Sequence, residues 1–171
     1  MISREGIKQE YEQFSFKHPY VMSIGEAALL FGVKHGLQKV GEKAGVPLGH
    51  GRRDSKTRNK VIEEHPVMAA TAATVWAPVS EELLFRELPA RILERKGYGK
   101  ESATSRAAKL GVATLFAAAH AGPDAIPLPQ LLGGIHYAAV HEKRGLGPSI
   151  AAHATHNVLQ ATRHLIASKK Q

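Results

Sequence analysis

The sequence predicts an all-α protein. Apolar residues recur near helical spacing along several stretches, and nowhere do polar and apolar residues alternate over several positions as they do in a strand. With 171 residues, the chain fits a single domain that is large enough to bury a core. We therefore expect a multi-helix bundle, with an N-terminal helical and basic loop region over residues 1–64 and a central helical core over residues 65–168.

The N-terminal region is expected to hold one helix followed by a loop. Residues 1–18 are charged and expected to be peripheral, and they lack an apolar stretch behind a basic start, so we expect no signal peptide. Residues 20–40 carry apolar side chains near helical spacing, with glycines that weaken the helix. Residues 41–60 combine turn residues with Lys and Arg, which indicates a solvated loop.

Helical patterns in the central core cover about 66–95, 102 or 105 to 121, 129–142, and 148–168. Pro66 suits a first helical turn. Pro78 is expected to break or kink its helix, with Ser80 capping a new one and Glu81 and Glu82 at the positive end of that helix. The charge-free segments are shorter than the ~20 residues of a spanning helix. Hydropathy alone therefore favours core helices of a soluble bundle, although small residues also suit helix packing in a bilayer.

Composition excludes some chemistries and leaves others open. The chain has no cysteine, which excludes disulfides, thiolate metal sites and a cysteine nucleophile. Its net charge of +8 suits an anionic membrane surface or another anionic partner, and also suits a soluble protein kept away from zero charge. The basic residues form no single stripe with interleaved aromatics, so we expect no nucleic-acid partner.

The first polar motif is Glu81-Glu82-x-x-x-Arg86. Glu82 and Arg86 are four residues apart and share a helix face, whereas Glu81 points about 100° away and is available for another task. Taken alone, the motif is equally typical of a surface acid pair at a helix start. Its apolar neighbours, such as Trp76 and Phe85, argue against a surface position.

Two further motifs lie on later apolar helices. His120 ends an alanine-rich helix with Phe116 one turn before it, and by itself this pattern also fits a hydrogen-bonded core histidine. His153 and Asn157 share a face and can bind a metal or donate hydrogen bonds to an oxyanion, or can form a polar seam between helices. Together, the three motifs can converge on one pocket that holds groups for acid–base chemistry.

The ordered set Glu-Glu-x-x-x-Arg, Phe-x-x-x-His and His-x-x-x-Asn resembles the CPBP family, which includes CAAX prenyl endopeptidases and bacteriocin-processing and immunity proteins. The stretch 145–150, Gly-Leu-Gly-Pro-Ser-Ile, before the last helix also resembles the family, and the likeness covers roughly residues 65–165. It implies a membrane-embedded, all-helical intramembrane peptidase with its active site between helices. This chain is shorter and less hydrophobic than the family pattern.

The resemblance also implies roles for the motif residues. Glu81 and His120 would activate water, His153 and Asn157 would stabilise the oxyanion, and Glu82 with Arg86 would support the site. We favour a site without a cofactor. If a divalent metal such as zinc takes part, as in a metalloprotease, its expected ligands are Glu81, His120 and His153.

The leading hypothesis is therefore a CAAX-protease-like endopeptidase that cleaves a peptide or protein substrate, with prenylated proteins among the candidates. The resemblance places it in the membrane as an integral protein, with a soluble cytoplasmic protein as the alternative. A second hypothesis is a catalytically idle immunity or interaction protein with the same fold. A third is a soluble basic helical protein that binds nucleic acid, which the scattered basic residues disfavour.

Overall fold

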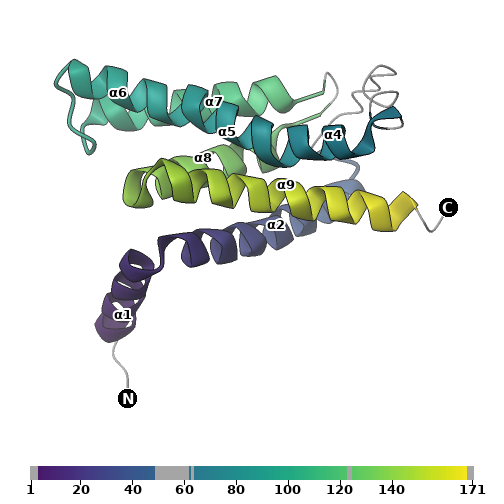
Figure 1. Ribbon diagram of the computed structural model, residues 1–171, viewed down its shortest axis with the longest axis horizontal. Coiled ribbons are helices and arrows are strands. Elements are labelled where there is room, and N and C mark those ends of the chain that lie inside the picture. Colours follow the sequence, from purple (N-terminus) through teal and green to yellow (C-terminus); the bar gives the residue numbers. More distant parts are fainter. Residues whose placement is uncertain (1–3, 49–61, 63, 123–124, 169–171) are drawn as a thin grey trace.

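The computed structural model describes residues 4–48, 62, 64–122 and 125–168, and in these ranges it confirms the all-α prediction (Figure 1). β-type pairing in the described residues is limited to an isolated bridge between Leu48 and Ile126. The helical elements are α1 (Arg4–Lys17), α2 (Pro19–Lys43), α4 (Pro66–Thr71), η1 (Ala72–Trp76), α5 (Ala77–Glu82), η2 (Leu83–Glu87), α6 (Leu88–Arg95), α7 (Ala103–His120), α8 (Leu128–Arg144) and α9 (Leu146–Ser168).

Helix α9 is central to the bundle. It packs against α2 on one side and against α8 and α5 on others, while α7 packs against α8. Figure 1 shows the stretch from α4 to α6 running along one side of α9 and α2 along the other, with α1 projecting away from the bundle. This arrangement brings the first polar motif, on α5 and η2, and the third, on α9, to one interface.

The stretch from 66 to 95 is one uninterrupted helical run, which differs from the break expected at Pro78. Two π-helical segments, η1 and η2, end just before Ala77-Pro78 and Leu88-Pro89. A proline lacks its N–H and clashes with the carbonyl four residues earlier, and a π-helical turn widens the backbone at that point. The chain therefore accommodates each proline without ending the helix.

The predicted cap at Ser80 is consequently wrong. Ser80 lies inside α5 and donates its hydroxyl to the carbonyl oxygens of Trp76 and Ala77. The prediction that Glu81 and Glu82 lie at the positive end of a helix is also wrong, because no new helix begins beside them. Other boundaries were predicted well: Pro66 occupies the first turn of α4, and Ser102 caps α7 by accepting a hydrogen bond from the backbone N–H of Ser105.

The connections between helices and the N-terminal segment follow the prediction in part. Gly145 separates α8 from α9 with a φ of +88°, a conformation that glycine adopts without strain. Residues 4–17 form a helix that the sequence analysis had treated only as charged periphery. Helix α2 continues to Lys43, so the loop predicted over residues 41–60 begins later than expected, and residues 49–60 of it lie outside the described residues.

Polar side chains fill much of the interior, whereas many large apolar side chains face outward. Glu82 and Ser149 are fully buried, while Trp76 is 69% and Leu84 60% exposed. The apolar core is small and contains Ala27, Phe116, Tyr137 and Ala152, with Phe85 packed against it. Among the helices that the structure describes, none combines the length and hydropathy needed to cross a bilayer.

Candidate active site

Glu81 is the meeting point of the three motifs. Its side chain is about one quarter exposed, and its Oε2 atom lies 3.5 Å from Nε2 of His120 and 3.6 Å from Nε2 of His153. These separations are too long for direct hydrogen bonds. Glu81 Oε2 is itself buried and has no hydrogen-bond partner among the described residues. A carboxylate oxygen placed between two imidazole nitrogens in this way can hold a water molecule.

The orientation of His120 is fixed by its own helix. Its Nδ1 lies 2.7 Å from the carbonyl oxygen of Phe116, and because a carbonyl only accepts, Nδ1 carries a proton and donates it. Nε2 then faces the carboxylate of Glu81. The nearby carboxylate of Glu81 raises the pKa of His120 above its usual value, and the hydrogen bond to the Phe116 carbonyl adds to this effect, against the opposing effect of burial. The imidazole Nε2 and the carboxylate of Glu81 therefore face each other across a gap of 3.5 Å.

His153 is held by the second glutamate. Its Nδ1 donates to Oε1 of Glu82 at 2.9 Å, which directs Nε2 toward Glu81. The Tyr137 ring stacks on the imidazole with centroids 4.5 Å apart and planes 15° apart. Since His153 and Tyr137 are only 4% and 1% exposed, packing on both sides keeps the imidazole in this orientation.

Glu82 is a fully buried carboxylate with charged and neutral partners. Ser149 donates to its Oε2 at 2.5 Å, and Arg86 lies 3.5 Å from its Oε1. Burial on its own would raise the pKa of Glu82, but the His153 hydrogen bond, the Arg86 charge and the Ser149 hydrogen bond together hold that pKa below its usual value. Glu82 therefore stays ionised and orients His153, as the predicted supporting role requires.

Arg86 connects this buried pair to the aromatic core. Its guanidinium lies 4.4 Å from the centroid of the Phe116 ring and donates to the carbonyl of Gly134 at 3.3 Å. Phe116 also packs edge-on against His153 and at a tilt against His120. One phenylalanine thus contacts both histidines and the arginine, which explains why the second motif needs a large ring one turn before its histidine.

Asn157 lies on the same face of α9 but is already engaged. Its Nδ2 donates to the backbone carbonyl of Ala73 at 2.8 Å, within the π-helical segment η1. The contact joins α9 to the helical run that carries Glu81. One amide hydrogen of Asn157 remains for a substrate oxygen.

In the described ranges, no group of three or more His, Asp or Glu side chains is arranged to hold a metal ion. The ligands expected from the resemblance, Glu81, His120 and His153, do converge, with Nδ1 of each ring hydrogen-bonded elsewhere and Nε2 facing Glu81. Imidazole ligands of a metal are oriented in the same way, so metal binding here stays a prediction, and the reaction proposed below uses the side chains alone.

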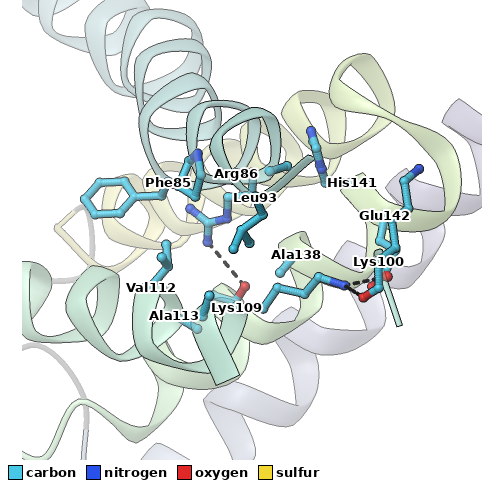
Figure 2. Close-up of a pocket in the computed structure, with 14 residues that line it drawn as sticks. Phe85, Arg86, Leu93, Lys100, Lys109, Val112, Ala113, Ala138, His141 and Glu142 are labelled. Carbon is cyan, nitrogen blue, oxygen red and sulfur yellow. Dashed lines mark hydrogen bonds and ion pairs between the residues drawn. The ribbon is translucent and has the colours of Figure 1, made fainter. Parts of the chain in front are cut away.

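A separate apolar cavity of about 90 Å³ lies on the other side of Arg86, between α6, α7 and α8. Figure 2 shows Arg86 reaching across it toward the α8 backbone, with Phe85, Leu93 and Val112 among the apolar walls. At its far end Lys109 donates to Glu142. The cavity shares Arg86 with the site, but Glu81, His120 and His153 are not among its walls.

Two contributors were not assigned a role from the sequence. Ser149 lies in the Gly-Pro-Ser segment that had been quoted only as part of the resemblance, and Tyr137 sits on a helix with no predicted site residue. The helical period gives the only signal for Ser149, which lies one turn before His153 on α9. Nothing in the local sequence marks Tyr137.

Comparison with known proteins places this geometry in a family. No curated protein and no solved structure matches the chain significantly. A family model does match, over residues 63–159, which is more than half of the chain and includes all three motifs. That model is described as type II CAAX prenyl endopeptidase Rce1-like. The match to this model, which represents CAAX-type endopeptidases, shows that the chain belongs to the Rce1-like family of type II CAAX prenyl endopeptidases.

Proposed function

We propose that the chain hydrolyses a peptide bond of a protein ending in a CAAX-type sequence, using a water molecule held by Glu81 between His120 and His153. The observation that carries this proposal is the buried, unpartnered Oε2 of Glu81, with one imidazole nitrogen at 3.5 Å and another at 3.6 Å. A water molecule at this position would form hydrogen bonds with the carboxylate of Glu81 and with Nε2 of both imidazoles. Family membership supplies the reaction class.

The proposed reaction needs no group beyond these side chains. Glu81 takes a proton from the water as its oxygen bonds to the carbonyl carbon, and the carbonyl oxygen becomes an oxyanion. Asn157, through its free amide hydrogen, and His153, whose Nε2 faces Glu81, stabilise that oxyanion. Glu81 passes the proton that it took from the water to Nε2 of His120. The carbon–nitrogen bond then breaks as His120 delivers this proton to the leaving nitrogen, and a carboxylate and an amine are released.

Glu81→Gln tests the proposal because it keeps the shape and removes the base. We expect a 10²- to 10⁴-fold lower kcat on a peptide that ends in a Cys-a-a-X sequence, supplied with and without a prenyl group on the cysteine. The control is Glu101→Gln, an exposed glutamate beyond the helical run that carries the site. Full activity of Glu81→Gln would show that Glu81 is not the base. Inactivity of the unmodified chain on every such peptide would favour the second hypothesis, a catalytically idle immunity or interaction protein with the same fold.

We propose further that the apolar exterior faces lipid. Val67, Trp76, Leu84 and Leu115 are each at least 60% exposed, around helices whose interior is polar. Exposed apolar surface of this extent is typical of a membrane contact. It supports a membrane location for the peptidase and gives a route for an apolar substrate to reach Glu81.

Trp76 is the single tryptophan of the chain and reports on this contact directly. With 69% of the residue exposed, its emission should shift to the blue on addition of anionic vesicles and be quenched by brominated acyl chains. Trp76→Phe supplies the background signal. An emission spectrum unchanged by vesicles would show that this face stays in water.

A further inference from the structure

The apolar cavity between α6, α7 and α8 has no part in the proposed reaction. Figure 2 shows Phe85, Leu93 and Val112 around it, from η2, α6 and α7. Small side chains such as those of Ala108 and Ala138 complete the wall and leave a space of about 90 Å³. Protein interiors contain few voids that are larger than a water molecule. The cavity is therefore a candidate binding site.

The chemistry of the wall favours an apolar occupant. Most polar side chains in the wall are already engaged with carboxylates. The pairs are Arg86 with Glu82, Lys109 with Glu142, and His141 with Glu87. The surface that remains for a ligand is mainly hydrocarbon. An ion or a polar group would lose its hydration there without compensation, whereas an apolar group gains from leaving water.

The size of the cavity narrows the class of occupant. An apolar cavity of about 150 Å³ binds benzene, which corresponds to about 25 Å³ per carbon atom. At that ratio, the cavity of about 90 Å³ takes roughly three or four carbon atoms. This is the size of a valine, leucine or isoleucine side chain. A prenyl or acyl chain is several times larger and cannot be enclosed.

The cavity begins one helical turn from the carboxylate of the active site. Phe85, in the cavity wall, follows Glu81 by four residues, so it lies on the same helix face about 6 Å further along the axis. The Phe85 ring packs edge-on against Phe116 at 5.5 Å, and Phe116 contacts the ring of His120 at 4.4 Å. An extended peptide advances about 3.3–3.6 Å per residue, so two residues span this separation.

We propose that this cavity is a specificity subsite, which binds the aliphatic side chain of the substrate residue two positions after the cleaved bond. The position of that bond rests on the proposed peptidase function, whereas the size and apolar character of the side chain rest on the cavity itself. Arg86 forms part of the wall and also lies 3.5 Å from Glu82. A bound side chain therefore packs against the group that supports Glu82.

Cleavage of matched peptides tests the preference. Two Cys-a-a-X peptides differ only at the second a, which is leucine in one and alanine in the other. The unmodified chain should cleave the leucine peptide with roughly 10- to 100-fold higher kcat/KM, because the leucine side chain buries three more carbon atoms. Equal kcat/KM for the two peptides would overturn the subsite.

Two neighbouring alanines on α7 provide a matched pair of variants. Ala108→Leu fills the cavity from its wall and should reduce the leucine preference below about threefold. Ala107→Leu adds the same side chain at an exposed position outside the wall and should keep the preference. The Tm of Ala108→Leu should not fall, since the new side chain occupies a void. A full preference in Ala108→Leu, or its loss in Ala107→Leu, would contradict the proposal.

Val112→Ala tests the subsite in the opposite direction and does not depend on the folding of Ala108→Leu. It removes two carbon atoms from the wall and enlarges the cavity toward the size of about 150 Å³ that binds benzene. A peptide with phenylalanine at the second a should then improve at least about tenfold in kcat/KM relative to the leucine peptide. An unchanged ratio would show that Val112 does not limit the size of this side chain and would count against the subsite.

Peptide binding separates the subsite from the proposed function. The Glu81→Gln chain, which is expected to cleave slowly, is titrated with the leucine and alanine peptides. Binding of the leucine peptide at least about tenfold more tightly, with the difference lost when Ala108→Leu is added, supports the subsite even if the unmodified chain cleaves neither peptide. Equal binding of the two peptides, or none, overturns it. Cleavage by the unmodified chain without a preference overturns the subsite and leaves the role of Glu81 untouched.

Discussion

Two Glu–His–Arg clusters follow one another along the same helical run, and they differ mainly in their surroundings. Glu82 pairs with Arg86 four residues later and with His153, and Glu87 pairs with Arg91 four residues later and with His141. The ion pairs of Glu87 are the shorter, at 2.6 and 2.8 Å against 3.5 and 2.9 Å. Yet Glu82 is fully buried, whereas the side chain of Arg91 is 65% exposed.

The ion-pair distances therefore do not predict which cluster contributes more to stability, because the energy of an ion pair also depends on how far it is buried away from water. Water screens the charges of Glu87 and competes for its hydrogen bonds, so a short pair there contributes little. Around Glu82, each charge left without its partner would remain buried. We expect the fully buried cluster to control both the fold and the orientation of His153, and the partly exposed cluster around Glu87 to control neither.

The largest difference should come from Glu82→Ala. Its removal leaves Arg86 buried without an anion and His153 without its acceptor, and we expect a loss of about 3–5 kcal/mol in the free energy of unfolding. Denaturant unfolding of the variant and the unmodified chain under the same conditions measures this loss. A loss below about 1 kcal/mol would show that Glu82 does not stabilise the interior and would undo the comparison.

The sequence predicted that the motif residues converge, but it did not predict how their surroundings differ in burial. The spacing of Glu82 and Arg86 set a common helix face, and the pattern around His153 set another, so the convergence of the motifs could be predicted. The apolar neighbours of Glu81 were taken to indicate burial, but Trp76 faces outward, whereas Phe85 packs against the core and Glu82 is fully buried. Periodicity identifies a face and does not say whether that face meets protein or another solvent.

Other features depend on contacts that no local pattern encodes. The π-helical segments accommodate Pro78 and Pro89, whereas residue propensity predicts a break or a bend at each proline. Lys34 and His156 are far apart in sequence and meet only after α2 packs against α9. Tyr137 acts through a ring stack on His153, which likewise requires the packed bundle.

A smaller effect, on the pH dependence of stability, separates the two glutamates of the first motif. Because Glu81 raises the pKa of His120, the stability from this pair is complete below the unfolded value of about 6.5 and is lost as pH rises through the folded pKa. Glu82 has a lowered pKa, so its contribution is present above about 4.3 and is lost only as pH falls through the folded pKa.

Unfolding free energies of His120→Gln and the unmodified chain, measured from pH 5 to 9, test this assignment. The difference between them should be largest at pH 5 and smaller at pH 9. Glu81→Gln should reduce this pH dependence, since the carboxylate that contributes most to the raised pKa of His120 is then neutral. A difference that grows with pH would give the opposite sign and would place the proton elsewhere.

The smallest expected effect is that of Glu87→Ala, and it completes the comparison. This variant also removes a carboxylate that pairs with an arginine and a histidine, but water can solvate Arg91, and His141 is only partly buried. We expect a loss of at most about 1 kcal/mol, reduced further at high salt. Catalytic rates should change little, because Glu87 contacts neither Glu81 nor the two histidines beside it. If Glu87→Ala instead costs as much as Glu82→Ala, burial is not what separates the clusters, and the shorter ion-pair distances of Glu87 would have to be given the greater weight.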